Sequence, residues 1–150
     1  MRISRYALIA LAVGTPGSPL VAQQRPDVQF IAPQGAAASL PFSPAVRVGN
    51  MLYLSGQLGT DSTGRLVPGG IEPETRQLMT NIKRLLEANG SSMERVVKCL
   101  VMLAYIAEWG RMNSVYVTFF PTNRPARSAM GASGLALGAR VEIECMAVTS

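Results

Sequence analysis

Apolar and polar side chains alternate strictly near the end of the chain. Every second position of the segment 140–148 is apolar, and these positions are Val141, Ile143, Cys145 and Ala147. The positions between them are Arg140, Glu142, Glu144 and Met146. Because successive side chains of a strand point to opposite faces, the pattern predicts a β-strand with one face in the core.

Two other stretches show the spacing of amphipathic helices. The first covers residues 72–89 and ends before Gly90. The apolar residues that recur on its face are Leu78, Ile82 and Leu85. The second covers residues 108–120 and ends at Pro121. The apolar residues along its face are Trp109, Met112, Tyr116 and Phe119.

Shorter apolar runs predict the remaining strands. Residues 46–48 and 51–55 flank the turn residues Gly49-Asn50, which is typical of a hairpin. The near-continuous apolar run at 93–103 predicts a buried strand, and the Gly/Ala/Leu mixture at 130–138 predicts a strand followed by a turn. The order β-β-α-β-α-β-β predicts an α+β domain with two helices packed on one face of a mixed sheet.

The start of the chain resembles a targeting segment. Residues 1–22 contain two early arginines, a short apolar run and a Pro/Gly-containing stretch, which is the order of a secretory signal. We therefore expect a cleaved signal and a periplasmic or secreted protein, or a cytoplasmic one if the start is mis-assigned. Residues 23–39 lack periodicity and predict a flexible arm, which leaves 40–150 as the folded domain.

Composition narrows the possible chemistry. The chain has 150 residues, 48% of them apolar and 15% charged, which suits one domain with a buried core. It has no histidine, which excludes Ser-His-Asp and Cys-His catalysis and every histidine-ligated metal centre. Two cysteines are too few for a zinc site built from cysteine alone. Acid–base chemistry must therefore come from other side chains or from water.

The positive charge is modest. The formal net charge of +5 falls to +3 if residues 1–22, with Arg2 and Arg5, are removed. The longest basic run is Lys83-Arg84, whereas nucleic-acid binders cluster their basic residues. We interpret the excess charge as a solubilising surface and expect no nucleic-acid partner.

Arg127 is the first candidate functional residue. It lies between Pro125 and a β-like run, and a guanidinium binds a carboxylate through two parallel hydrogen bonds. The competing interpretation is a surface arginine or a structural salt bridge.

Glu142 and Glu144 form the second candidate. They lie two residues apart on one strand face, about 7 Å from each other, and a buried carboxylate can act as acid or base. The competing interpretation is a solvent-facing strand edge or an ion pair with Arg140.

The two cysteines lie inside predicted apolar strands. Cys99 and Cys145 are expected to pack as small hydrophobes, and their strand positions do not predict that they pair.

The segment Pro125-Ala126-Arg127-Ser128, followed by Val141-Glu142-Ile143-Glu144, resembles the C-terminal signature of the RidA/YjgF family of imine deaminases. The similarity runs through about 110 residues in the same order. The earlier segments that carry it are Leu40-Pro41-Phe42-Ser43-Pro44-Ala45, Val48-Gly49-Asn50, Ser55-Gly56-Gln57, the helix containing Asn81, and Asn113-Ser114-Val115-Tyr116.

This resemblance implies a chorismate-mutase-like α+β fold and a homotrimer with clefts between subunits. It implies hydrolysis of 2-imino acids, such as 2-iminobutanoate and 2-iminopropanoate, to 2-keto acids and ammonia without a metal or an organic cofactor. The resemblance implies that Arg127 binds the substrate carboxylate and that Glu142 positions the water and transfers the proton. The implied substrate-binding positions are Ser55, Gly56, Asn113, Phe42 and Ala129.

Two of these positions depart from the family pattern. Phe42 stands where many members carry an aromatic hydroxyl, and Ala129 where they often have cysteine. Two alternatives to the deaminase remain open at this point: a trimeric protein that binds a small carboxylate without turnover, and an RNA-directed relative.

Overall fold

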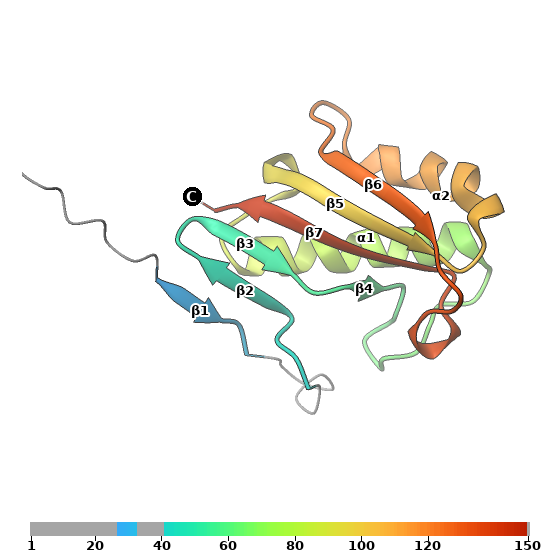
Figure 1. The fold of residues 1–150 in the computed structure, drawn as a ribbon, viewed down its shortest axis with the longest axis horizontal. Helices are drawn as coiled ribbons and strands as arrows, with labels where there is room; N and C mark the ends of the chain where they lie inside the picture. Colours follow the sequence, from blue (N-terminus) through green and yellow to red (C-terminus); the bar gives the residue numbers. More distant parts are fainter. Residues whose placement is uncertain (1–26, 33–40, 150) are drawn as a thin grey trace, which may run out of the picture.

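The computed structural model describes residues 27–32 and 41–149. They form one mixed sheet with two helices on one face, which confirms the predicted α+β architecture (Figure 1). The strands are β1 (Val28–Phe30), β2 (Ala45–Val48), β3 (Met51–Leu54), β4 (Gln57–Leu58), β5 (Val96–Leu103), β6 (Ala126–Gly131) and β7 (Val141–Val148). The helices are α1 (Ile71–Ala88) and α2 (Trp109–Tyr116), and α2 continues into a short 3₁₀ turn.

The strand order is β1-β2-β3-β7-β5-β6, with β4 also paired to β7. Strand β7 thus lies near the middle of the sheet and pairs antiparallel with β5 on one side and β3 on the other. Strands β5 and β6 run parallel, because α2 crosses over between them.

The core lies between the helices and the sheet. On α1 two residues of the predicted apolar stripe, Leu78 and Ile82, are inaccessible to solvent, as is the neighbouring Leu86, whereas Leu85 is half-buried at the edge of the core. On β7 the predicted alternation holds, because Val141 and Ile143 face the helices while the side chains between them lie on the other face. Two independent periodicities, one helical and one extended, therefore meet in a single core.

The predicted hairpin is also confirmed. Strands β2 and β3 pair antiparallel, and Gly49-Asn50 forms a two-residue turn. Gly49 has a φ of 57°, a left-handed conformation that glycine adopts without steric cost.

The strand predicted at 130–138 is misplaced. Strand β6 lies earlier, and residues 136–138 form a 3₁₀ turn. As an edge strand, β6 exposes most of its side chains, so its sequence has no apolar alternation by which to locate it.

The flexible arm predicted at 23–39 also needs correction. Its residues 28–30 form β1, which pairs antiparallel with β2 and extends the sheet. All three side chains are exposed, so no buried pattern marked the strand. Residues 27, 31 and 32 of the arm are also described. The rest of the arm and the whole of the predicted signal at 1–22 lie outside the described residues.

A disulfide joins β5 to β7. Cys99 and Cys145 are direct partners in the antiparallel register, with Cα atoms 4.1 Å apart, and both are buried. Their predicted burial is confirmed, but they are bonded to each other rather than packed as separate thiols. Only the register of two strands distant in the sequence brings them face to face.

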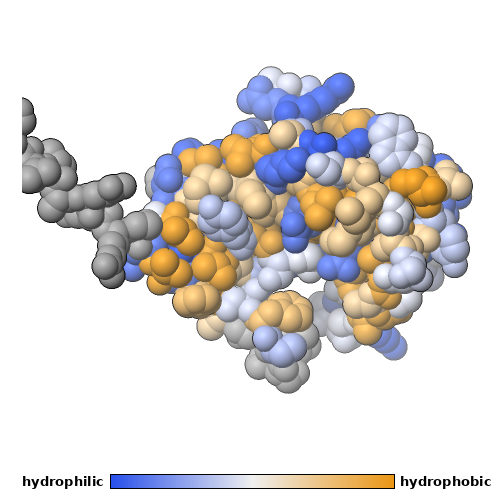
Figure 2. All heavy atoms as spheres, viewed as in Figure 1, coloured by the Kyte–Doolittle hydropathy of each residue, from blue (hydrophilic) through white to orange (hydrophobic). Residues whose placement is uncertain are grey.

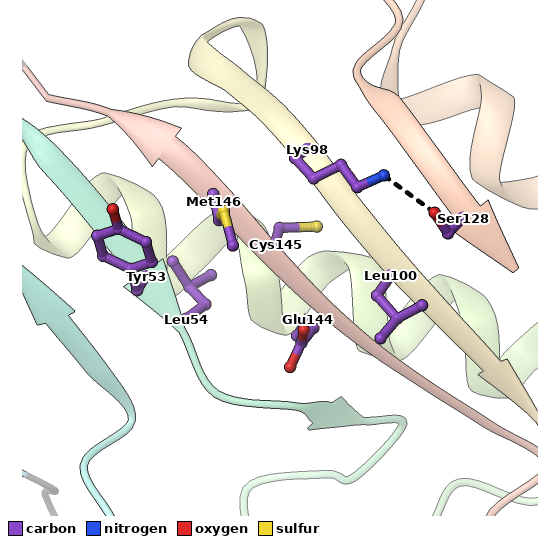
Figure 3. A pocket seen from close by; sticks show the side chains of 8 residues that line it. All are labelled: Tyr53, Leu54, Lys98, Leu100, Ser128, Glu144, Cys145 and Met146. Carbon is purple, nitrogen blue, oxygen red and sulfur yellow. Dashed lines mark hydrogen bonds between the residues drawn. The ribbon is translucent and has the colours of Figure 1, made fainter.

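The sheet face opposite the helices is open. Figure 2 shows apolar and polar side chains mixed over this face. By strand register and exposure, its apolar side chains include Tyr53, Met130 and Met146. A shallow depression of about 350 Å³ lies on this face, and Figure 3 shows Lys98, Ser128 and Glu144 along its wall. Among the described residues, no helix is both long and apolar enough to cross a membrane.

Candidate active site

Arg127 lies on β6 with its side chain directed toward α2. Its Nη1 donates a hydrogen bond of 2.7 Å to Oδ1 of Asn113. Its Cζ lies 4.7 Å from the ring centroid of Tyr116 and 5.5 Å from that of Trp109. No carboxylate in the described part of the chain lies within 4.0 Å of the guanidinium, so the interpretation as a structural salt bridge is wrong within those residues. The charge of Arg127 is held by neutral groups and stays available to an anion.

Helix α2 supplies all three of these partners. Trp109, Asn113 and Tyr116 are spaced i, i+4 and i+7, so they follow one face of the helix. The helical spacing predicted that the two aromatic residues share one face of the helix, but not that their rings contact Arg127. The family resemblance implied that Asn113 binds substrate, and in this structure its amide oxygen accepts a hydrogen bond from Arg127.

Tyr116 contributes its ring rather than its hydroxyl. Its side chain is buried, and the hydroxyl oxygen has no hydrogen-bond partner in the described structure. Burial raises the pKa of Tyr116 to about 12, against the opposing effect of Arg127. The phenol therefore remains neutral at physiological pH.

Glu142 lies on β7 and faces the open side of the sheet together with Glu144. Burial, and secondarily the charge of Glu144, raise the pKa of the Glu142 carboxyl. A raised pKa makes Glu142 a stronger base than an ordinary glutamate, which suits a group that accepts a proton and returns it. The predicted alternative of an ion pair with Arg140 is wrong, because Arg140 binds both carboxylate oxygens of Glu108 at 2.9 and 3.0 Å.

Gly56 makes room for Glu142. A Cβ at residue 56 would overlap Oε1 of Glu142 and lie 2.9 Å from its Cδ. The family resemblance implied that Gly56 binds substrate, and in this structure the group that approaches its backbone closely is the glutamate side chain. Gly56 and Glu142 thus form one unit of the site.

Ser55 ties this unit to the segment before β2. Its hydroxyl donates a hydrogen bond of 2.7 Å to the carbonyl oxygen of Ser43. The neighbouring Phe42 is 49% exposed, so its ring is accessible from solvent. Ser55 therefore serves to position backbone in this structure, with Phe42 close by in sequence.

The two halves of the candidate site do not meet within one chain. In the cross-strand register, Arg127 lies level with Cys99 and Cys145. Glu142 lies level with Met102 and Met130. Three residues of strand and two strand spacings separate them, or roughly 14 Å between Cα atoms. Arg127 also faces α2, while Glu142 faces the open side.

Ala129 lies two residues beyond Arg127 on β6, so its side chain points to the same face. It is exposed and leaves the space beside Arg127 free of a larger side chain.

No group of three or more histidine, cysteine, aspartate or glutamate side chains that could hold a metal ion occurs among the residues described.

The sequence model of one protein family, described as Endoribonuclease L-PSP, matches residues 33–149. Curated relatives that match this chain carry RidA names, and solved structures that match it carry Rid and YjgF names. The chain belongs to the RidA/YjgF family.

Mammalian members of this family are similar to the chain over most of its length. A mouse protein named 2-iminobutanoate/2-iminopropanoate deaminase is 44% identical over 113 residues, which is 75% of this chain and 84% of that protein. A cattle protein of the same name is 46% identical and covers 75% and 82% of the two chains.

Solved structures of the family share the fold. The E. coli YjgF gene product superposes with a TM-score of 0.75 at 31% identity, covering 81% of this chain and 99% of that one. RidA from Psychrobacter has a TM-score of 0.73 at 37% identity, covering 80% and 98%. The match to nearly the full length of both proteins confirms the predicted RidA/YjgF fold.

Proposed function

We propose that the protein hydrolyses 2-imino acids to 2-keto acids and ammonia. The observation that carries the proposal is the state of Arg127, a half-buried arginine held only by neutral groups in the described structure. A cation fixed without an acidic partner suits an anionic ligand, and a planar guanidinium suits a carboxylate. The deaminase names of relatives 44–46% identical support this reaction over other carboxylate chemistry.

In the proposed reaction, Arg127 binds the substrate carboxylate through two parallel hydrogen bonds. Glu142, ionised, accepts a proton from a water that attacks the C=N carbon and passes it to the nitrogen, which gives a neutral tetrahedral carbinolamine. Glu142 then takes the proton of the carbinolamine hydroxyl and delivers it to the nitrogen as the C–N bond breaks, so that ammonia and the 2-keto acid leave and Glu142 is again ionised. One imine and one water are consumed, and no redox change occurs. The C=N carbon is already electrophilic, so the proposed reaction requires no cofactor.

We further propose that each site lies between two subunits of a homotrimer. The roughly 14 Å between Arg127 and Glu142 and their opposite faces support this arrangement, because one substrate cannot reach both in a single chain. The open sheet face, with exposed Tyr53 and Met146, offers a surface on which a second copy can pack.

The test is hydrolysis of an imine made in the assay. An amino-acid oxidase acting on alanine generates 2-iminopropanoate, and keto-acid or ammonia release is followed above the spontaneous rate. Arg127→Ala should lose at least about 100-fold in kcat/KM, while Arg84→Ala, which removes an exposed arginine on α1, should keep full activity. Equal rates for wild type and Arg127→Ala would contradict the proposal.

The alternative is a protein that binds a small carboxylate without turnover. A stable 2-keto acid such as 2-oxobutanoate separates the two functions in a thermal-shift measurement. Stabilisation that disappears in Arg127→Ala, with no acceleration of imine hydrolysis by wild type, would favour the binding protein.

We also propose that the protein is exported and works in an oxidising compartment. The signal-like order of residues 1–22 supports export, and the Cys99–Cys145 disulfide supports folding where disulfides persist. The mature N-terminus and the thiol content of protein from each cell fraction test this proposal. An intact leader together with two alkylatable cysteines would contradict it.

A further inference from the structure

Two arginines of this fold lie over aromatic rings, and they differ in one respect. Cζ of Arg140 lies 5.4 Å from the ring centroid of Tyr105, and its guanidinium donates hydrogen bonds to both carboxylate oxygens of Glu108. Arg127 lies against two rings, and among the described residues its guanidinium donates one hydrogen bond, to the neutral amide of Asn113. The first arginine is neutralised within the chain, whereas the second is oriented and left charged.

A long arginine side chain needs such constraints to present its fork in one direction. Fixing it costs side-chain entropy, which attraction to a neighbouring group must offset. A salt bridge at Arg127 would compete with a substrate carboxylate, whereas aromatic faces attract the cation without occupying its N–H donors. One bond to Asn113 leaves most of the five donors of Arg127 free.

The two rings are held by different parts of α2. Tyr116 is 4% exposed and packs against Phe120, with ring centroids 4.9 Å apart. Trp109 is the first residue of α2 and is 42% exposed, so its indole borders both Arg127 and solvent. The guanidinium thus lies near one ring fixed in the core and one ring at the surface.

We propose that Trp109 and Tyr116 are positioning residues that orient Arg127 for carboxylate binding through their ring faces. This inference rests on the proposed function of Arg127. The Tyr116 hydroxyl, which has no partner in the described structure, plays no part in it.

The experiment measures the Kd of 2-oxobutanoate, and kcat and KM for the imine, in ring variants. Trp109→Ala and Tyr116→Leu should each raise Kd and KM about 3- to 30-fold, with a smaller change in kcat. The conservative variants Trp109→Phe and Tyr116→Phe keep an aromatic face and should recover most of the affinity. Because Trp109 lies at the surface, its variants should fold even if Tyr116→Leu does not.

Phe120→Leu is the matched control. It removes a buried ring that packs on Tyr116, whereas the rings that lie against Arg127 in the described structure are those of Trp109 and Tyr116. It should lower Tm while leaving Kd within about twofold of wild type. If loss of this ring weakened carboxylate binding as much as loss of Trp109, the effect would be general packing and the inference would fail.

A double-mutant cycle separates positioning from direct contact with the ligand. In the Arg127→Lys background, which lacks the planar fork, Trp109→Ala should cost clearly less affinity than in wild type. An equal cost in both backgrounds would overturn the inference, as would unchanged Kd in both ring variants while Arg127→Ala abolishes binding. Failure of wild type to bind 2-oxobutanoate or to hydrolyse the imine would instead overturn the proposed function.

Discussion

The side chains of Arg127 and Glu142 point to opposite faces of the same sheet. The register places Arg127 level with Cys99 on the helix side and Glu142 level with Met102 on the open side. This relationship governs how the proposed reaction is organised, because in the proposed trimer the group that binds the carboxylate and the group that moves the proton come from different copies.

Mixing two inactive variants tests this organisation. Subunits carrying Arg127→Ala and subunits carrying Glu142→Gln should regain activity when refolded together at equal concentration. In a cyclic trimer every mixed assembly has one site with both native residues, so random mixing should restore about one quarter of wild-type activity. Each variant refolded alone is the control. No recovery in proven mixed trimers would mean that both residues act within one subunit.

Gly56→Ala should disable Glu142 without unfolding the protein. The new methyl group would occupy the space of the Glu142 carboxylate, so that side chain must move. We expect about a 100-fold loss of kcat/KM, since small displacements of a catalytic group have effects of this size. Gly110→Ala is the matched control, because a Cβ built there has no described atom within 4 Å apart from its chain neighbours and the backbone of its own helix. Full activity in Gly56→Ala would argue against a role for Glu142.

The raised pKa of Glu142 predicts the sign of a pH effect on stability. A carboxyl whose pKa is higher folded than unfolded opposes folding when it is ionised, and this cost disappears as pH falls through the raised pKa toward 4.5. Glu142→Gln should therefore have a higher Tm than wild type at pH 7, and the two proteins should converge near pH 4. Thermal unfolding across this pH range measures the difference. A constant difference at all pH values would contradict the burial of this charge.

The pH dependence of activity should report the ionisation of Glu142. The kcat/KM of wild type should fall with decreasing pH as Glu142 becomes protonated, and its raised pKa should place this fall at a higher pH than for an unperturbed glutamate. Glu144→Gln removes the neighbouring charge that contributes to the shift and should move this limb of the profile to lower pH. An unchanged profile in that variant would contradict the coupling between the two glutamates.

Reduction of the disulfide should destabilise the fold. The bond closes a loop with a sequence separation of 46 residues, for which loop entropy gives about 4 kcal/mol and measured disulfides typically give 2–4 kcal/mol. Urea unfolding of wild type with and without a reductant measures this difference. The Cys99→Ala/Cys145→Ala double variant should be insensitive to the reductant. A wild type equally stable under both conditions would show that the bond contributes nothing.

Elements with a buried face were predictable from local spacing. The alternation along β7 and the helical stripe of α1 record burial directly, because burial selects apolar residues at the period of each structure. Strands β1, β4 and β6 were missed or misplaced. They are short or lie at an edge with exposed side chains, so the core left no pattern in them.

The sequence by itself determined the fold class, the family and the residue types available for chemistry. Those depend on local periodicity, on motifs in a fixed order and on the absence of histidine. Only the tertiary structure decided that Cys99 faces Cys145 and that Gly56 receives Glu142. It also decided that Arg127 stays without an acidic partner in the described chain. Each of these facts depends on the register between strands and on helix docking, which join residues far apart in sequence and leave no local signal.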